Sequence, residues 1–306
     1  MLNIIITGAN GFIAKHLINY LSSTKKYQLH LISTHPESFP PETLNESNII
    51  CYSIESFKEH LFSQHRMVDV DSNIHLAFAR TRNGRDYATS LEYTEKVAKL
   101  ATEIKPRLFI NVSTQSIYGE NQPAFWKEST PPAPNCRYAI AKYAAEIILH
   151  SNFVNSDIKW TSLRLPPICQ NSGFILSFIK DVLSGNQIVT TNNNRYSYID
   201  IRDAVSAIVS VITHSNDKFD VIYNVGDNIL YGTYELALYV QKEGMDKYNL
   251  HSPISHTNFS EQIDYVMDSS TFRKKYGWLP KYNITDMVAD TFYQEYSKIQ
   301  SKYENN

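Results

Sequence analysis

The feature that most constrains the fold is the glycine-bearing turn in "IIITGANGFIA", Ile4–Ala14. The apolar run at its start predicts a buried strand. The small residues Gly8, Gly11 and Ala14 follow as an amphipathic segment begins. Such a turn lets backbone N–H groups approach a phosphate at the N-terminus of a helix, although a tight turn without a ligand would look similar. Because the turn directly follows the first strand, we expect it to bind the pyrophosphate of a dinucleotide. The residues assigned to this phosphate loop are Gly8, Asn10, Gly11, Phe12 and Ile13.

Short apolar runs alternate with amphipathic segments in the first half of the chain, which is typical of a parallel sheet covered by helices. The expected strands are Asn3–Thr7, Gln28–Ser33, Asn73–Ala77, Leu108–Ser113, Lys159–Leu163 and Val221–Gly226. The expected helices lie near Ala14–Leu21, Thr89–Thr102, Tyr138–Phe153 and Arg202–Thr213. The sequence therefore predicts an α/β fold of the Rossmann type, with a doubly wound parallel sheet.

This alternation breaks between Pro166 and Tyr196 and again from Asp227 onward, where Asn, Ser and Tyr are more frequent. We expect a dinucleotide-binding domain formed by residues 1–166 and 197–226. Residues 167–196 and 227–306 would form a smaller, C-terminal substrate-binding lobe. The chain contains no repeat or flexible linker, so the two parts are expected to share a cleft.

Composition limits the possible partners. With 42% apolar and 20% charged residues and a net charge of −2, the chain lacks a general electrostatic signature for nucleic acid or an anionic membrane. No apolar run approaches the length of a bilayer span, and the chain opens in a strand-like segment, so a cytoplasmic protein is expected. The three cysteines are far apart and predict free thiols, and the histidines show no ligand spacing, so no metal is implied.

The second strand, in "QLHLISTHPE", bears on the choice of cofactor. An acidic residue about 20 positions after the glycine turn usually binds the adenosine ribose. Here the tip of the strand is Ser33, Thr34 and His35, whose side chains can donate hydrogen bonds to a 2′-phosphate. NADP(H) is therefore favoured and NAD(H) remains possible. The lack of Arg or Lys at this tip counts against NADP(H).

Tyr138 and Lys142 are four residues apart in "RYAIAKYAAEIILH", a segment that reads as a helix. On a helix this spacing makes the phenol and the ammonium neighbours. The pair could be a catalytic couple or two side chains that merely share a helix face, and the spacing alone does not decide.

The segments "TGANGFIA", "NIHLAFAR", "LFINVSTQSIYG", "RYAIAKYAAE" and "VIYNVG" decide the matter together. In order and spacing they resemble the extended short-chain dehydrogenase/reductase family, which includes nucleotide-sugar epimerases, dehydratases and 4-ketoreductases. The resemblance extends to "DSSTFRKKYGWLPKYNITDMV" near the C-terminus and so covers nearly the whole chain.

The resemblance implies that Thr114, Tyr138 and Lys142 are catalytic, with Ser113 as the alternative hydroxyl to Thr114. A free phenol has a pKa of about 10, and a nearby ammonium together with an oxidised nicotinamide would lower it. Residues implied near the cofactor are Leu76, Ala77, Phe78, Arg80, Tyr138, Lys142 and Pro166, although Arg80 could equally be a surface side chain. Residues implied near the substrate are Thr114, Ser116, Tyr138 and Arg195.

Departures from the family pattern narrow the reaction. The 4,6-dehydratases carry Asp-Glu after the catalytic Thr, and GDP-fucose synthases carry a Cys where Ser116 stands, whereas this chain has Gln115-Ser116. Where many relatives have Arg-x-x-Asn, this chain reads Arg164-Leu165-Pro166-Pro167, so the Asn amide is replaced by a proline without a polar side chain. Arg195 therefore becomes the candidate for binding the substrate diphosphate, although it could also be an arginine of a surface loop.

The expected activity is therefore NADPH-dependent reduction of the 4-keto group of a nucleotide-linked 4-keto-6-deoxyhexose. The alternative is an NAD-dependent nucleotide-sugar 4-epimerase, which would use the same catalytic residues. A non-catalytic NADP-binding regulator is a distant third, because it would not need Thr114, Tyr138 and Lys142.

A homodimer is also expected, because the helices containing Thr89–Thr102 and Tyr138–Phe153 resemble those that pair across a two-fold axis in this family. Their apolar residues exceed what one sheet face needs, unless they all pack on their own sheet. These residues are Val97, Leu100, Ala101, Ile140, Ala144, Ile147 and Ile148.

Overall fold

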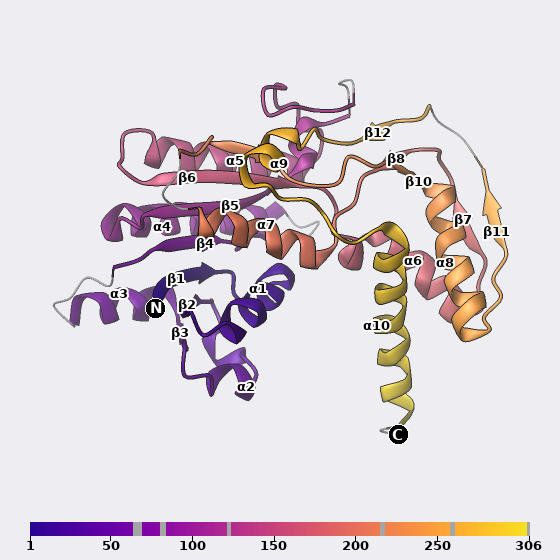
Figure 1. Ribbon diagram of the computed structural model, residues 1–306, viewed down its shortest axis with the longest axis horizontal. Coiled ribbons are helices and arrows are strands. Elements are labelled where there is room, and N and C mark those ends of the chain that lie inside the picture. The colour runs from indigo at the N-terminus through magenta and orange to yellow at the C-terminus, as the bar shows by residue number, and fades with distance from the viewer. Residues whose placement is uncertain (64–68, 80–83, 121–123, 215–217, 258–260, 305–306) are drawn as a thin grey trace. The chain divides into compact units, whose positions relative to one another are not determined.

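The computed structural model describes residues 1–63, 69–79, 84–120, 124–214, 218–257 and 261–304 (Figure 1). The chain forms two compact units. Unit 1 consists of Met1–Gly119, Pro131–Arg164 and Val205–Tyr223. Unit 2 consists of Glu120–Thr130, Leu165–Ala204 and Asn224–Asn306.

A seven-stranded sheet organises unit 1, in the order β3-β2-β1-β4-β5-β6-β9. Its strands are β1 (Leu2–Thr7), β2 (Tyr27–Ile32), β3 (Ile49–Tyr52), β4 (Ser72–His75), β5 (Leu108–Thr114), β6 (Lys159–Leu165) and β9 (Ile222–Asn224). The pairs β1–β2, β1–β4, β2–β3 and β4–β5 are parallel. This confirms the predicted Rossmann-type sheet. The sequence analysis did not predict β3.

Helices cover both faces of this sheet (Figure 1). They are α1 (Phe12–Ser23), α3 (Ile54–Ser63), α4 (Gly84–Ile104), α5 (Arg137–Phe153) and α7 (Ile201–Thr213), with shorter turns at η1 (Pro36–Ser38), α2 (Pro41–Leu44) and η2 (Gln115–Tyr118). One apolar core joins α3, α4 and α5 to Ile5, Ile32 and Phe109. Side chains alternate along a strand, so Ile4 and Ile6 point to the opposite face, where α1 lies. Double coverage explains why these isoleucines are fully buried.

The register of β1 aligns the carboxyl ends of three strands. Thr7 lies opposite Ile32 of β2 and opposite His75 of β4. The Thr7 hydroxyl is 2.7 Å from His75 Nδ1, which ties β1 to β4 at this point. The three loops that follow these strands therefore leave the same edge of the sheet.

A buried ion pair joins α5 to β6. The Arg164 guanidinium donates from Nε to Glu146 Oε1 at 3.1 Å and from its NH2 group to Oε2 at 2.7 Å. It also lies over the ring of Tyr118 at 4.8 Å. The two side chains are only 1% and 7% exposed, so burying their charges costs free energy. The two-point hydrogen bonding offsets this cost.

Unit 2 has its own core, shared by α6 (Gly173–Leu183), α8 (Thr233–Tyr248) and α10 (Ile284–Glu304). Two small sheets accompany these helices. One pairs β7 (Ile188–Thr190) with β11 (Ile254–His256), and the other has the order β10 (Tyr231–Gly232), β8 (Arg195–Tyr196) and β12 (Asp264–Tyr265). Two shorter helices are the 3-10 helix η3 (Cys169–Asn171) and α9 (Ser270–Tyr276).

The largest differences between the compact units and the predicted domains lie in two segments. Unit 2 includes Glu120–Thr130, whose Trp126 N–H donates to the Val266 carbonyl at 3.1 Å. It also includes residues up to Ala204, because the Asp203 carboxylate accepts hydrogen bonds from the N–H groups of Lys281 and Tyr282. Partners so distant in sequence could not be read from local patterns.

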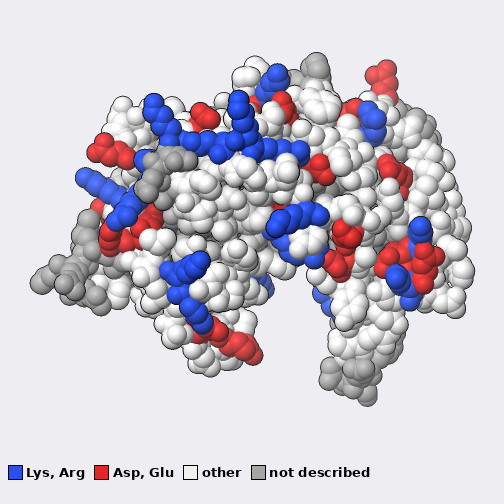
Figure 2. Space-filling view, in the orientation of Figure 1, with Lys and Arg blue, Asp and Glu red and all other residues white. Residues whose placement is uncertain are grey.

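The surface and the thiols are consistent with the composition. The face shown in Figure 2 carries both basic and acidic side chains, and much of it is uncharged. Among the described residues, no helix is both long and apolar enough to cross a bilayer. Cys51, Cys136 and Cys169 are free thiols, as predicted.

Candidate functional site

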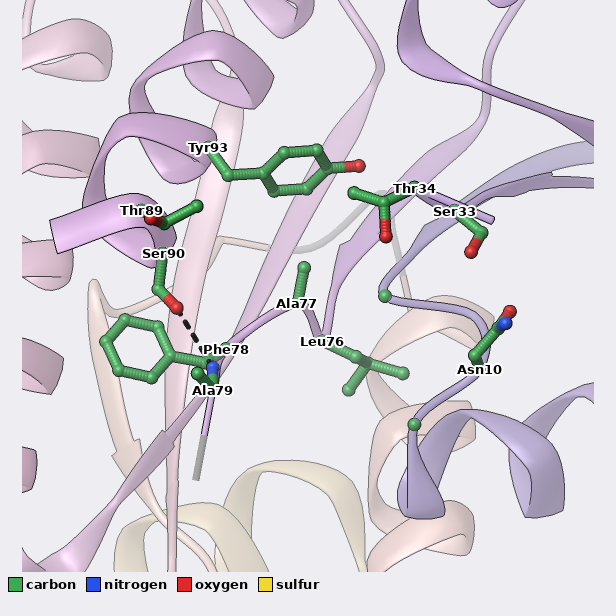
Figure 3. A pocket seen from close by; sticks show the side chains of 12 residues that line it. Asn10, Ser33, Thr34, Leu76, Ala77, Phe78, Ala79, Thr89, Ser90 and Tyr93 are labelled. Carbon is green, nitrogen blue, oxygen red and sulfur yellow. Dashed lines mark hydrogen bonds between the residues drawn. The ribbon is translucent and has the colours of Figure 1, made fainter. Parts of the chain in front are cut away.

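A cavity of about 320 Å³ lies in unit 1 at the edge where β1, β2 and β4 end (Figure 3). Three loops and one face of α4 form its walls. Its lining residues are Gly8, Asn10, Gly11, Ser33, Thr34, Leu76, Ala77, Phe78, Ala79, Thr89, Ser90 and Tyr93.

The glycine turn packs directly on the loop that follows β4. Gly8 has φ +73°, and a Cβ at this position would lie 2.5 Å from both N and Cα of Ala77. Gly11 caps α1 without a side chain, and the first turn of α1 contains no acidic residue. The N–H groups at the start of α1 therefore form the positive end of the helix dipole without an internal anion, which suits a phosphate.

Eight of the predicted cofactor residues line the cavity: Gly8, Asn10, Gly11, Ser33, Thr34, Leu76, Ala77 and Phe78. Phe12 and Ile13 begin α1 and are half-buried, outside the lining set. Pro166 belongs to unit 2, where its ring approaches Gly226. Arg80 lies outside the described residues.

The tip of β2 corrects one expectation. His35 does not line the cavity, and its Nδ1 lies 3.3 Å from a carboxylate oxygen of Glu37. The turn η1 after His35 brings this carboxylate back toward the strand tip. The tip is therefore not free of acidic groups, although Ser33 and Thr34 do present hydroxyls at the cavity.

Unit 1 also contains all three predicted catalytic residues. Thr114 ends β5, where its Oγ1 accepts a hydrogen bond from Ser116 N and donates one to Ser116 Oγ, both at 3.2 Å. Tyr138 and Lys142 lie in the first half of α5. Lys142 is buried, and its Nζ donates to the carbonyl of Val112 at 2.7 Å. This bond ties α5 to β5 two residues before Thr114.

Phe78 connects Tyr138 and Lys142 to the cavity. Its ring centroid is 4.5 Å from Lys142 Nζ, and its ring meets that of Tyr138 edge-on at 6.2 Å. Tyr87 of α4 completes the group, at 6.4 Å from Phe78 and 6.3 Å from Tyr138. Since Phe78 also lines the cavity, Tyr138 and Lys142 adjoin the part of the cavity wall that Phe78 forms.

Burial sets the charge state of this region. It lowers the pKa of Lys142 to about 8, against the opposing effect of Glu146. It also lowers the pKa of His75 to about 3, with help from the charge of Lys142. At neutral pH Lys142 is therefore mostly an ammonium and His75 is neutral.

Neutral His75 links three elements. Its Nδ1 meets the Thr7 hydroxyl, and its Nε2 lies 3.1 Å from Thr94 Oγ1. Thr94 donates its own proton to the Ser90 carbonyl, so His75 must carry its proton on Nε2 and accept from Thr7. Sequence reasoning missed this role of His75. It also missed that Thr89, Ser90 and Tyr93 line the cavity. The available signal was their spacing of three and four residues on the helix that follows β4.

Arg195 lies in unit 2, on β8. Its Nε donates to Asp264 Oδ1 at 2.7 Å, and its NH2 group contacts the second carboxylate oxygen. Hydrogen bonding to Arg195 holds the pKa of the Asp264 carboxyl below its usual value. The predicted diphosphate contact is thus already paired with a carboxylate, which the sequence did not reveal.

The sequence matches the model of the NAD dependent epimerase/dehydratase family over residues 4–226. The protein belongs to this family of enzymes, within the extended short-chain dehydrogenases/reductases that the motifs indicated. Human dTDP-D-glucose 4,6-dehydratase is 25% identical over 326 residues, which cover 91% of this chain and 85% of the human protein.

Solved structures show the same fold. UDP-glucose 4-epimerase of Thermotoga maritima, determined with UDP-glucose, has a TM-score of 0.80 at 23% identity and covers 97% of this chain and 100% of its own. The dTDP-glucose 4,6-dehydratase of Bacillus anthracis, determined with NAD, has a TM-score of 0.78 at 19% identity and covers 97% of each chain.

We predict that Gly8→Ala lowers the free energy of unfolding by about 3 kcal/mol or more, because left-handed backbone strain adds to overlap with Ala77. Gly185→Ala is the matched control. Gly185 has φ +70° but open space around it, so that variant should lose only about 1–2 kcal/mol. Urea denaturation measures both, and equal losses would show that the close packing at Gly8 is unimportant.

We also predict that stability depends on pH through Lys142. Its pKa is about 8 in the folded protein and 10.5 for a lysine free in solution, so between these values the unfolded chain binds more protons. The free energy of unfolding should therefore rise by roughly 3 kcal/mol across this window, relative to Lys142→Met. Urea melts of both proteins from pH 7 to 10.5 measure the difference, and parallel profiles would contradict it.

Proposed function

We propose that this protein catalyses hydride chemistry at C4 of a nucleotide-diphosphate sugar, as an NAD(P)-dependent 4-epimerase. The supporting observation is the position of Phe78, which contacts Tyr138 and Lys142 and also lines the cavity of the glycine turn. A proton-transfer group and a site suited to a dinucleotide thereby adjoin each other within one unit.

The residues of the cavity suit such a cofactor. The glycine turn has no room for a side chain at Gly8, and the N-terminus of α1 would hold the pyrophosphate. Ser33 and Thr34 would bind the adenosine ribose, and Leu76, Ala77 and Phe78 would border the other half. When bound, a nicotinamide dinucleotide accepts hydride from the sugar carbon and returns it.

The chain's own residues would move the proton and bind the sugar oxygen. Tyr138 takes a proton from the C4 hydroxyl as that carbon is oxidised and gives one back on reduction. The ammonium of Lys142, fixed by the Val112 carbonyl, favours the deprotonated phenol. Thr114 Oγ1 would hydrogen-bond the same sugar oxygen. A tuning of the phenol by about three pKa units corresponds to roughly 4 kcal/mol of differential interaction.

Dehydration is the activity named for the human relative, but the residues after Thr114 argue against it here. Gln115 is a buried amide and Ser116 a hydroxyl, and neither can replace the acid/base pair of the 4,6-dehydratases. NADPH-dependent 4-ketoreduction is the second candidate, favoured by the hydroxyls of Ser33 and Thr34 in the cavity. Glu37 beside His35 favours NAD over NADP and hence the epimerase.

Arg195 would contact the diphosphate of the substrate through the part of its half-exposed guanidinium not bonded to Asp264. The nucleotide-sugar class of substrate is supported by membership of the family and by the UDP-glucose in the Thermotoga maritima structure.

The test combines nucleotide extraction with turnover. Protein purified without added cofactor should release NAD, and it should interconvert C4 epimers of UDP- or dTDP-hexoses. Tyr138→Phe should reduce turnover about 10³-fold, because the proton carrier is lost, and leave NAD affinity unchanged. Tyr143→Phe, one residue beyond Lys142 on α5, is the control and should keep full activity. Oxidation of NADPH by 4-keto sugars without epimerisation would establish the 4-ketoreductase instead.

We infer a homodimer formed through α5. Ile140 and Ile147 on α5 and Val154, the residue directly after α5, recur every seven residues and are 54%, 49% and 54% exposed. Val97, Leu100 and Ala101, expected at the same interface, are instead fully buried in the core of unit 1. The stripe on α5 is therefore the part that a second copy would cover.

Light scattering should give a mass of about 70 kDa, twice the 35.2 kDa of one chain. Ile147→Asp should shift it to that of one chain, because a charge on the stripe cannot be buried cheaply. Ile229→Asp, at a similarly exposed isoleucine of unit 2, should remain a dimer. A single-chain mass for the unmodified protein at micromolar concentration would rule out this dimer.

A further inference from the structure

One wall of the cavity in unit 1 is a face of α4 that carries three hydroxyl groups (Figure 3). Thr89 and Ser90 fall on the same face as Tyr93 because they precede it by four and three residues. The hydroxyl of Ser90 donates to the Asp86 carbonyl at 2.8 Å, and that of Thr89 donates to the Arg85 carbonyl at 3.2 Å. The helix itself therefore uses two of the three donors.

The third hydroxyl, that of Tyr93, is in a different state. It is closed to solvent and has no hydrogen-bond partner among the residues that the structure describes. Burial raises the pKa of Tyr93 to about 12, with a contribution from Glu55, so the group keeps its proton and remains a donor. A buried hydroxyl that makes no hydrogen bond destabilises the free protein, and a ligand that supplied an acceptor would remove this penalty.

The ring of Tyr93 is held in place. It stacks on His75 with centroids 6.4 Å apart and packs against the core of α3, α4 and α5. His75 is itself fixed by Thr7 and Thr94. The hydroxyl therefore cannot reach water by a simple rotation of the side chain, and any partner must come to it through the cavity.

The direction of this hydroxyl indicates which part of a ligand it would meet. In Figure 3 it points toward the end of the cavity where Ser33 and Thr34 lie, away from Phe78. Phe78 marks the end at which Tyr138 and Lys142 are found. A dinucleotide whose reactive half lies beside Phe78 would place its adenosine half at Tyr93.

We propose that the Tyr93 hydroxyl hydrogen-bonds the adenosine half of the dinucleotide, a role that rests on the proposed function of the cavity. Tyr93 thereby contributes to cofactor affinity and takes no part in proton transfer. Ribose oxygens and adenine ring nitrogens are the acceptors that this half of the ligand offers. Thr34, whose side chain is exposed at this end, can rotate to open the way to the hydroxyl.

Tyr93→Phe tests this role, because it removes one oxygen and keeps the ring. We expect the Kd for ADP-ribose, measured by calorimetry, to rise about tenfold, since one hydrogen bond is lost from the complex. The thermal midpoint of the ligand-free protein should stay the same or rise, because the unpartnered hydroxyl is gone.

Tyr52→Phe is the matched control. The Tyr52 hydroxyl is also buried without a partner in the described part of the chain, and it lies in unit 1 but outside the cavity lining. This variant should keep the ADP-ribose affinity of the unmodified protein.

Two results would overturn the role of Tyr93. One is an unchanged Kd for ADP-ribose in Tyr93→Phe, and the other is a lower thermal midpoint of its ligand-free form, which would reveal a partner within the protein. If the unmodified protein binds neither ADP-ribose nor NAD, the dinucleotide site itself is refuted and Tyr93 with it. The first two results would leave the proposed function intact, so the two failures are distinguishable.

Discussion

The candidate site depends on the close approach of the glycine turn to the loop after β4. Gly8 and Ala77 are so close that no side-chain atom fits between them. This approach follows from the register of β1 with β4 and from the bond between Thr7 and His75, one residue before Gly8. Because the two loops meet there through backbone atoms, no side chain at position 8 stands between the cavity and the start of α1, which suits the approach of a phosphate.

A second constraint comes from the charges buried along α5. Lys142 and Glu146 lie one turn apart on this helix, and each is buried. Glu146 is paired at two points with Arg164 of β6, so its charge is largely neutralised there. The carboxylate consequently opposes, without outweighing, the effect of burial on the pKa of Lys142. The ion pair thus fixes α5 to the sheet, and the pKa of Lys142 stays at about 8, close to neutral pH.

Much of unit 1 could be predicted from the sequence because its signals are local. A buried run such as Ile4–Ile6 followed by two glycines specifies a strand, a turn and a helix start within about ten residues. The spacing of Tyr138 and Lys142 placed both on one helix, as α5 confirms, and the family resemblance predicts a catalytic role for them. What the sequence did not reveal depends on contacts between distant segments. Arg195 pairs with Asp264, 69 residues away, and Trp126 with Val266. Glu37 returns to the strand tip through a turn whose geometry no periodic pattern encodes. Tyr93 became a candidate only when the absence of a hydrogen-bond partner among the described residues could be seen.

The hydrogen bond from Lys142 to the Val112 carbonyl has an evolutionary consequence. It joins the helix that carries Tyr138 to the strand that ends in Thr114, so the spacing of Thr114, Tyr138 and Lys142 is set inside unit 1. Unit 2 carries none of these three residues. Insertions, deletions and substitutions could therefore accumulate in unit 2 without disturbing that spacing. Under the proposed function, a lineage built on this chain could change its substrate by altering unit 2 while it keeps the reactive residues of unit 1 in place.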